Sequence, residues 1–189
     1  MGPEISQFLS GMKKTIEQVV MPNLTDRFAQ EQAGIVAATL GFLGTVQDKV
    51  FHYELLENYE YKRILREFVD LFTQQKDTPT ALKNILENIH KHFADDQPGD
   101  AVYLRPYTYI RASNEVMKEL LCELIQQQPA MSVNLRSTFE GVLKPFFKSI
   151  ESRERSWVKA LGFDPEAKHQ PDIANLLYSE GYLNINNNA

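Results

Sequence analysis

The segment ILENIHKHFADD, residues 85–96, carries the side chains best suited to metal chemistry in this sequence. Glu87 and His90 form a Glu-x-x-His pair, and His90 and His92 form a His-x-His pair. Helical bundles that hold two metal ions use Glu-x-x-His pairs that project into the bundle interior. The segment is therefore either half of a metal site or the polar end of a helix.

Helical geometry favours the polar helix end. At about 100° per residue, His90 and His92 point about 200° apart and cannot bind one ion on an intact helix. Glu87 lies about 140° from the centre of the apolar stripe of its helix, so it faces outward. A second Glu-x-x-His, formed by Glu166 and His169, lies in a single turn between two prolines. We interpret both motifs as surface polar residues and predict no metal site.

A less obvious group lies on the apolar side of a long predicted helix. Glu57 and Glu60 fall within about 40° of the centre of its stripe. A carboxylate in that position must be solvated, paired with a cation or protonated. The side chains that could complete a site around the two glutamates are Tyr53, Tyr61 and Lys118.

Two interpretations of these glutamates stay open. They could form an acid–base pair, or an anchor for a metal or ligand, in a cleft of the bundle. They could also fill a gap where the carboxylates reach water or a structural cation, because buried structural ion pairs have the same sequence signature.

The remainder of the chain predicts an all-α fold in one domain. Apolar residues recur at spacings of three and four, and no segment alternates as a strand would. A long second helix is expected to run from residue 25 to about residue 75 and to bend or split at Gly41 or Gly44. Pro145 is expected to kink a helix that stops at Gly162, and the charged run 151–156 is interpreted as solvated. The predicted parts are an N-terminal helix (1–21), a first hairpin (25–93), a second hairpin (106–161) and an extension with a frayed tail (163–189).

An internal repeat supports the two hairpins. NYEYKRILREFV, which begins at Asn58, aligns without gaps with NEVMKELLCELI, which begins at Asn114. Lys62 then meets Lys118, and the apolar positions coincide. We predict two related hairpins that pack into one bundle, since neither could bury its apolar face alone. Asn58 and Asn114 are expected to bridge the hairpins by hydrogen bonds.

Composition excludes several classes of protein. The net charge of -5 argues against nucleic-acid binding, which requires a basic surface. The single cysteine, Cys122, excludes an internal disulfide, and we expect it to be at least half-buried on a helix. The apolar run 33–46 is shorter than the roughly 20 residues of a membrane span and predicts a buried helix instead. No secretory leader is recognised at residues 1–10, so we expect a cytoplasmic protein.

The sequence therefore predicts a non-enzymatic helical protein that binds a protein partner or itself. The first alternative is a carboxylate-based metal or acid–base site at Glu57 and Glu60. The second is a module that holds an apolar small ligand between the hairpins. No cofactor is predicted.

Overall fold

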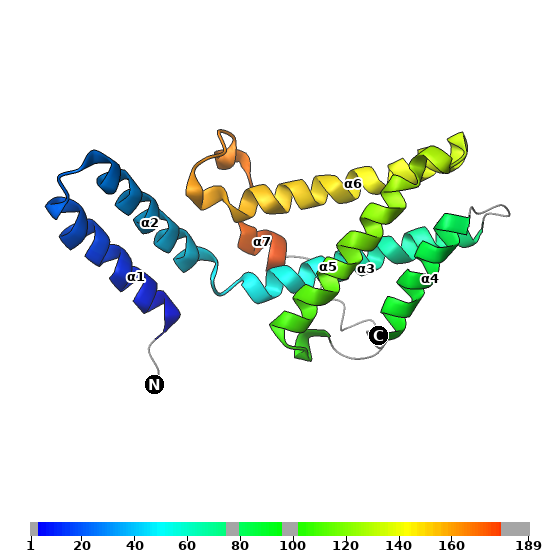
Figure 1. The fold of residues 1–189 in the computed structure, drawn as a ribbon, viewed down its shortest axis with the longest axis horizontal. Helices are drawn as coiled ribbons and strands as arrows, with labels where there is room; N and C mark the ends of the chain where they lie inside the picture. The colour runs from blue at the N-terminus through cyan, green and yellow to red at the C-terminus, as the bar shows by residue number, and fades with distance from the viewer. Residues whose placement is uncertain (1–3, 75–79, 96–101, 179–189) are drawn as a thin grey trace. The chain divides into compact units, whose positions relative to one another are not determined.

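The computed structural model describes residues 4–74, 80–95 and 102–178, and the regular structure in these ranges is helical (Figure 1). This confirms the all-α prediction. Contacts divide the chain into two compact units, residues 1–50 with 151–176 and residues 51–150 with 177–189. Each unit has its own internal packing.

The first unit begins with a helical hairpin. Its helices run antiparallel, side by side (Figure 1). Asp26 caps the second helix, because its carboxylate accepts a hydrogen bond of 2.8 Å from the Ala29 amide. The elements are α1 (Ile5–Thr15), a π turn (Ile16–Val20), a 3-10 turn (Met21–Asn23) and α2 (Arg27–Val46).

The long helix predicted over residues 25–75 is two helices. α2 ends at Val46, three residues form a turn, and α3 (Val50–Thr73) follows. The split comes directly after Gly44, one of the two glycines expected to interrupt the helix. Lys49 stabilises the end of α2, because its ammonium donates a hydrogen bond of 2.8 Å to the Thr45 carbonyl.

The second segment of the first unit begins at Glu151, within the last turns of α6 (Val133–Trp157). Its 3-10 turn Lys159–Leu161 contacts α2. Gly162 ends this turn in the left-handed conformation, with φ of 71°. The helix that was expected to run to Gly162 itself ends earlier, at Trp157. Arg155 fixes the loop that follows by donating two hydrogen bonds, of 2.8 and 3.1 Å, to the Asp164 carboxylate. These bonds lower the pKa of Asp164 below its ordinary value. The unit closes with most of α7 (Ile173–Tyr178).

The second unit is a bundle of α3, α4 (Thr80–Asp95), α5 (Tyr107–Gln126) and most of α6. Ser132 caps α6, since its hydroxyl accepts a hydrogen bond of 3.3 Å from the Leu135 amide. α6 continues through Pro145. The residue types also predict a helix start at Pro79 and a turn-rich loop over residues 94–100. α4 extends into that range as far as Asp95, and Pro79, the rest of the loop and the frayed tail fall outside the described residues.

An aromatic cluster lies in the core of this bundle. The ring centroids of Phe68 and Phe139 are 4.4 Å apart, and Phe72 lies 5.9 Å from Phe139. All three side chains are essentially inaccessible to water. Each such side chain stabilises the fold by roughly 2–3 kcal/mol through burial. Aliphatic side chains from the four helices complete the core, among them Ile64, Leu65, Leu82, Ile89, Met117, Leu124 and Leu143.

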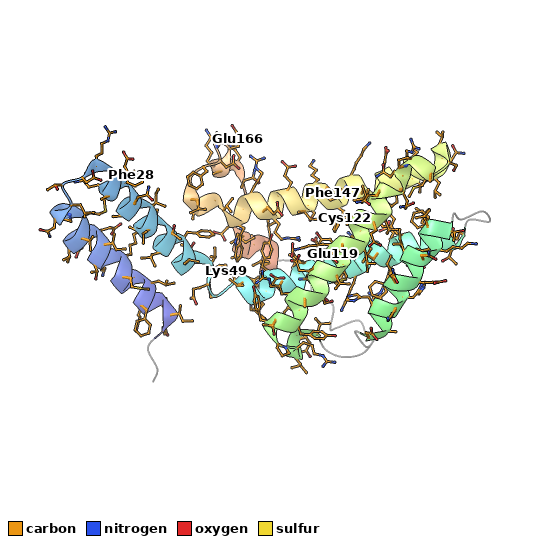
Figure 2. The ribbon with its side chains drawn as sticks, in the orientation of Figure 1. Phe28, Lys49, Glu119, Cys122, Phe147 and Glu166 are labelled. Carbon is orange, nitrogen blue, oxygen red and sulfur yellow. The ribbon has the colours of Figure 1, made fainter. Side chains whose placement is uncertain are left out.

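Three sequence expectations about burial are wrong. In the charged run 151–156, Arg153 is only 2% exposed, so the run is not a solvated face throughout. Cys122 lies exposed on α5 (Figure 2). The apolar run 33–46 is not a buried helix, because Ile35 and Val36 remain 59% and 48% exposed. Apolar spacing marks a side of a helix but does not say whether a neighbouring helix covers it.

Candidate functional site

The contacts of the two predicted glutamates lead to different helices. Glu57 on α3 is 5% exposed, and its carboxylate lies 3.1 Å from the Lys118 ammonium on α5. Glu60 is half-buried and accepts a hydrogen bond of 3.1 Å from the Ser149 hydroxyl on α6. The structure therefore brings Glu57 and Lys118 together, as the sequence suggested, and directs Glu60 toward another neighbour.

Lys118 is held between carboxylates and an aromatic ring. Its ammonium lies 3.1 Å from Glu57, 3.4 Å from Glu115 and 5.9 Å from the centre of the Tyr61 ring. Partial burial by itself lowers the pKa of Lys118, but the Glu57 and Glu115 carboxylates outweigh it, and the net pKa is raised. A lysine with a raised pKa stays charged at neutral pH and is poorly suited to act as a base or nucleophile.

The two predicted tyrosines lie in different surroundings. Tyr61 is buried, and its ring packs edge-on against Phe146 with 5.3 Å between the centroids. Tyr53 is half-buried and lies about two helical turns before Tyr61 on α3. Tyr61 thus lies next to Glu57 and Lys118. The three residues form an ion pair with an adjacent aromatic ring, beside the aromatic core.

A network of buried and half-buried polar side chains joins α3 and α5. We call it the polar network, and it consists of Asn58, Ser113 and Asn114, which are buried, and Glu54 and His92, which are half-buried. Asn58 donates to the Asn114 side-chain oxygen at 2.9 Å and to the Ser113 hydroxyl at 3.3 Å. Asn114 donates to the Glu54 carbonyl at 2.9 Å and to its carboxylate at 2.8 Å. The predicted bridge between Asn58 and Asn114 is therefore present.

His92 extends the polar network to α4, since its Nε2 atom hydrogen-bonds with the Ser113 hydroxyl at 3.1 Å. A serine beside a histidine is also the pairing that nucleophilic catalysis uses. Here the hydroxyl is buried within a helix and also accepts from Asn58, so a substrate has no direct approach to it. The sequence analysis missed Ser113 and His92, although Ser113 occupies a position on the apolar side of its helix, between Ile110 and Met117, where a polar residue is a signal.

The two Glu-x-x-His motifs behave as polar surface. Glu87 and His90 are exposed, and the His90 ring nitrogen lies 2.8 Å from the Leu86 carbonyl. Glu166 and His169 lie 3.6 Å apart, and both side chains are about two-thirds exposed. Across residues 4–74, 80–95 and 102–178, no three histidine, cysteine or acidic side chains group closely enough to hold a metal ion.

The hairpin of α1 and α2 exposes many large apolar side chains. Among the residues that the structure describes, half of the exposed large hydrophobic side chains lie between residues 5 and 43. They are 40–67% exposed, and Phe28 is the most exposed of them (Figure 2). α1 contributes no buried residue and α2 contributes two, Ala37 and Val46. The nine side chains are Ile5, Phe8, Met12, Val19, Val20, Phe28, Ile35, Val36 and Leu43.

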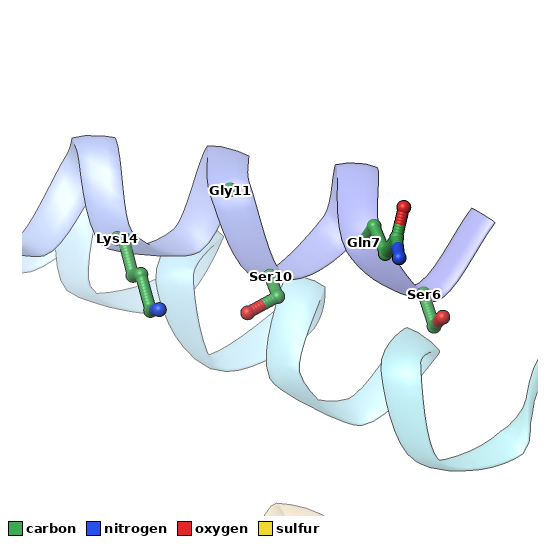
Figure 3. A pocket seen from close by; sticks show the side chains of 5 residues that line it. All are labelled: Ser6, Gln7, Ser10, Gly11 and Lys14. Carbon is green, nitrogen blue, oxygen red and sulfur yellow. The ribbon is translucent and has the colours of Figure 1, made fainter. Parts of the chain in front are cut away.

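α1 also has a polar side, which carries a shallow hollow (Figure 3). The five residues that line it come from α1 alone: Ser6, Gln7, Ser10, Gly11 and Lys14. At 100° per residue, their mean direction is about 160° from that of Ile5, Phe8 and Met12. Because all of its lining residues come from one helix, we interpret the hollow as part of the water-facing side of the hairpin.

No protein-family model, no curated protein and no solved structure matches this chain. Within the described residues, no helix combines the length and the apolar character that crossing a bilayer requires.

Proposed function

We propose that this protein acts by binding another polypeptide, and that its contact surface is the apolar side of the α1–α2 hairpin. The observation that carries this proposal is the exposure of nine large apolar side chains on the hairpin, whose two helices bury only Ala37 and Val46. An apolar helical surface of this kind is typical of protein–protein contacts.

The amino-acid composition of α2 supports the same function. After Glu31, the helix carries no charged residue up to its end at Val46. Exposed helices of soluble proteins normally place charged residues on the side that faces water, and a helix that is apolar all round is normally buried. The small residues Ala37 and Gly41 face α1, because Ala37 is buried and a side-chain carbon at Gly41 would lie 3.2 Å from the Lys13 ammonium. The large apolar residues are thus left for a partner.

The contacts in the second unit favour catalysis less. Glu57 is paired with a lysine whose pKa is raised, and Ser113 is buried within a helix. Both arrangements stabilise a bundle without exposing a reactive group. A carboxylate-based site and an apolar ligand between the hairpins remain the alternative hypotheses.

Site-specific photo-crosslinking tests the proposal. A benzophenone amino acid would replace Phe8 on the hairpin or Phe163, which is 84% exposed in the same unit outside the hairpin. Both are phenylalanines that a benzophenone mimics, so they form a matched pair. Each variant would be irradiated in the cells that make the protein and its products resolved by denaturing electrophoresis and mass spectrometry.

We expect the Phe8 variant to form a discrete adduct with a polypeptide, of this or another sequence, and the Phe163 variant to form none. Adducts with lipid alone, no adduct, or equal adducts at both positions would contradict a protein-binding hairpin.

A further inference from the structure

We infer that the polypeptide bound by the hairpin is a second copy of this chain, so that two α1–α2 hairpins pack face to face as four helices. This inference rests on the proposed function and adds the identity of the partner. It follows from the placement, area and charge of the apolar side chains.

The apolar side chains of α1 and α2 share one side of the hairpin. Ile5, Phe8 and Met12 lie within about 60° of one another around α1. Their direction is roughly 110° from that of Lys13, whose side chain lies beside Gly41 of α2. On α2, Val36 and Leu43 lie about 20° apart and at least 100° from the buried Ala37. Because the two right-handed helices run in opposite directions, these rotations place both sets on the same side.

The area of this side matches what a dimer requires. The five side chains on it, each 41–63% exposed, present roughly 500 Å² of apolar surface. A standard interface buries about 800 Å² on each partner, of which about 65% is apolar in homodimers, or roughly 500 Å². The hairpin therefore presents enough apolar surface for a homodimer. The five side chains are Ile5, Phe8, Met12, Val36 and Leu43.

The charge of the hairpin is compatible with pairing to itself. Residues 4–46 hold three cations and four anions, so two copies meet with little net repulsion. Helices that bind a lipid surface usually have a cationic flank, and binding of a charged partner needs a strongly charged face. The hairpin has neither. The cations are Lys13, Lys14 and Arg27, and the anions are Glu4, Glu17, Asp26 and Glu31.

Two hairpins are also a natural unit of helix packing. Two helices alone enclose almost no core, as the lack of buried residues in α1 shows. Four antiparallel helices enclose a continuous core along their length. A second copy supplies the two missing helices with the same apolar spacing and the same length.

Sedimentation velocity of the purified full-length chain tests this inference. We expect a concentration-dependent species of twice the chain mass of 21.7 kDa at micromolar concentration. Met12→Glu places a carboxylate in the shared face of each copy, and we expect it to raise the dimer dissociation constant at least about 100-fold. Ser10→Glu is the matched control, since it adds the same charge on the polar side of the same helix and should leave the dissociation constant within about threefold. Circular dichroism of each variant reports whether the helices persist.

Disulfide trapping provides a measurement that does not depend on a disruptive variant. In a Cys122→Ser background, we expect a chain with Met12→Cys to oxidise to a covalent dimer at least tenfold faster than a chain with Ser10→Cys. Both positions lie on α1, about 160° apart around the helix.

A monomer of the unaltered chain at all concentrations, equal effects of Met12→Glu and Ser10→Glu, or equal rates of trapping would overturn the second copy as the partner. If Phe8 nevertheless photo-crosslinks to a different polypeptide, the proposed interaction function stands and only its partner is another protein. If Phe8 crosslinks to no polypeptide, the interaction function itself fails.

Discussion

The α1–α2 hairpin and the α3–α6 bundle have similar apolar sequence patterns, but the bundle buries its large apolar side chains and the hairpin exposes them. Both repeat apolar residues at spacings of three and four, and both contain large aromatic and aliphatic side chains. In the bundle, Phe68 and Phe139 are excluded from water, whereas Phe8 and Phe28 in the hairpin are more than half exposed. The number of helices that meet makes the difference, because four helices can enclose a core and two cannot.

The bundle adds buried polar contacts that the hairpin lacks. The polar network and the pair of Glu57 and Lys118 lie between its helices, where an unpaired polar group is costly. The ion pairs of the hairpin lie on its surface, as between Arg27 and Glu31, whose side chains are 91% and 58% exposed. Surface pairs of this kind contribute little to stability. The comparison predicts that equivalent substitutions have unequal effects in the two regions.

The largest difference is expected between two phenylalanines. Phe68→Ala removes a fully buried ring that contacts Phe72 and Phe139, and we expect it to lower the free energy of unfolding by about 3–5 kcal/mol. Phe28→Ala removes a ring that is 67% exposed and should change it by less than about 0.5 kcal/mol. Urea denaturation followed by circular dichroism measures both, and similar losses would show that the hairpin has a core of its own.

An intermediate effect is expected in the polar network. Asn114→Ala removes the shorter of the two hydrogen bonds that the Asn58 amide donates and both bonds that Asn114 donates to Glu54, and should lower the free energy of unfolding by about 2–3 kcal/mol. Adding Asn58→Ala should cost less than it does in the unaltered chain, because the bond between the two is already lost. The double-mutant cycle, measured by urea denaturation, gives this coupling, and strictly additive losses would mean that the two amides act independently.

A smaller effect is expected for the ion pairs. Lys118→Met should lower the free energy of unfolding by about 1–2 kcal/mol at neutral pH, because it removes a cation that lies 3.1 Å from the buried Glu57 carboxylate. Arg27→Met in the hairpin, whose partner stays hydrated, should leave stability unchanged within error.

The pH dependence of this difference identifies its cause. The pKa of Lys118 is raised on folding, so its contribution is complete below the unfolded pKa of about 10.4 and is lost as the pH rises through the higher folded value. The stability difference between the unaltered chain and Lys118→Met should therefore be constant from about pH 7 to 10 and shrink above that range. A constant difference up to pH 12 would assign the effect to packing of the lysine stem instead.

Local signals in the sequence predicted most of the helices and several of their ends. Ser132 and Gly162 act at helix ends as their types suggest, because capping and left-handed backbone depend on the residue itself. The contact of Glu57 with Lys118 was also predictable, since Glu57 lies on the apolar side of its helix and Lys118 lies on a helix expected to pack beside it.

Features that depend on the neighbouring element could not be predicted. The contact of Glu60 with Ser149, and that of His92 with Ser113, require knowing which helices adjoin. The burial of Arg153 and the exposure of Val36 could not be predicted for the same reason. The helical spacing of apolar residues is the same whether or not another helix covers that side. The internal repeat and the paired hairpins stay predictions.

The polar network has a further consequence for the bundle, because it fixes the sliding position of α5 against α3. Leucine and phenylalanine side chains exchange one apolar neighbour for another with little preference, so an apolar seam alone tolerates a shift of one helical turn. A shift of about 5.4 Å would separate Asn114 from Asn58 and from Glu54 together, and would leave two amides in an apolar interior. The network thus excludes alternative registers and gives the two helices a single alignment.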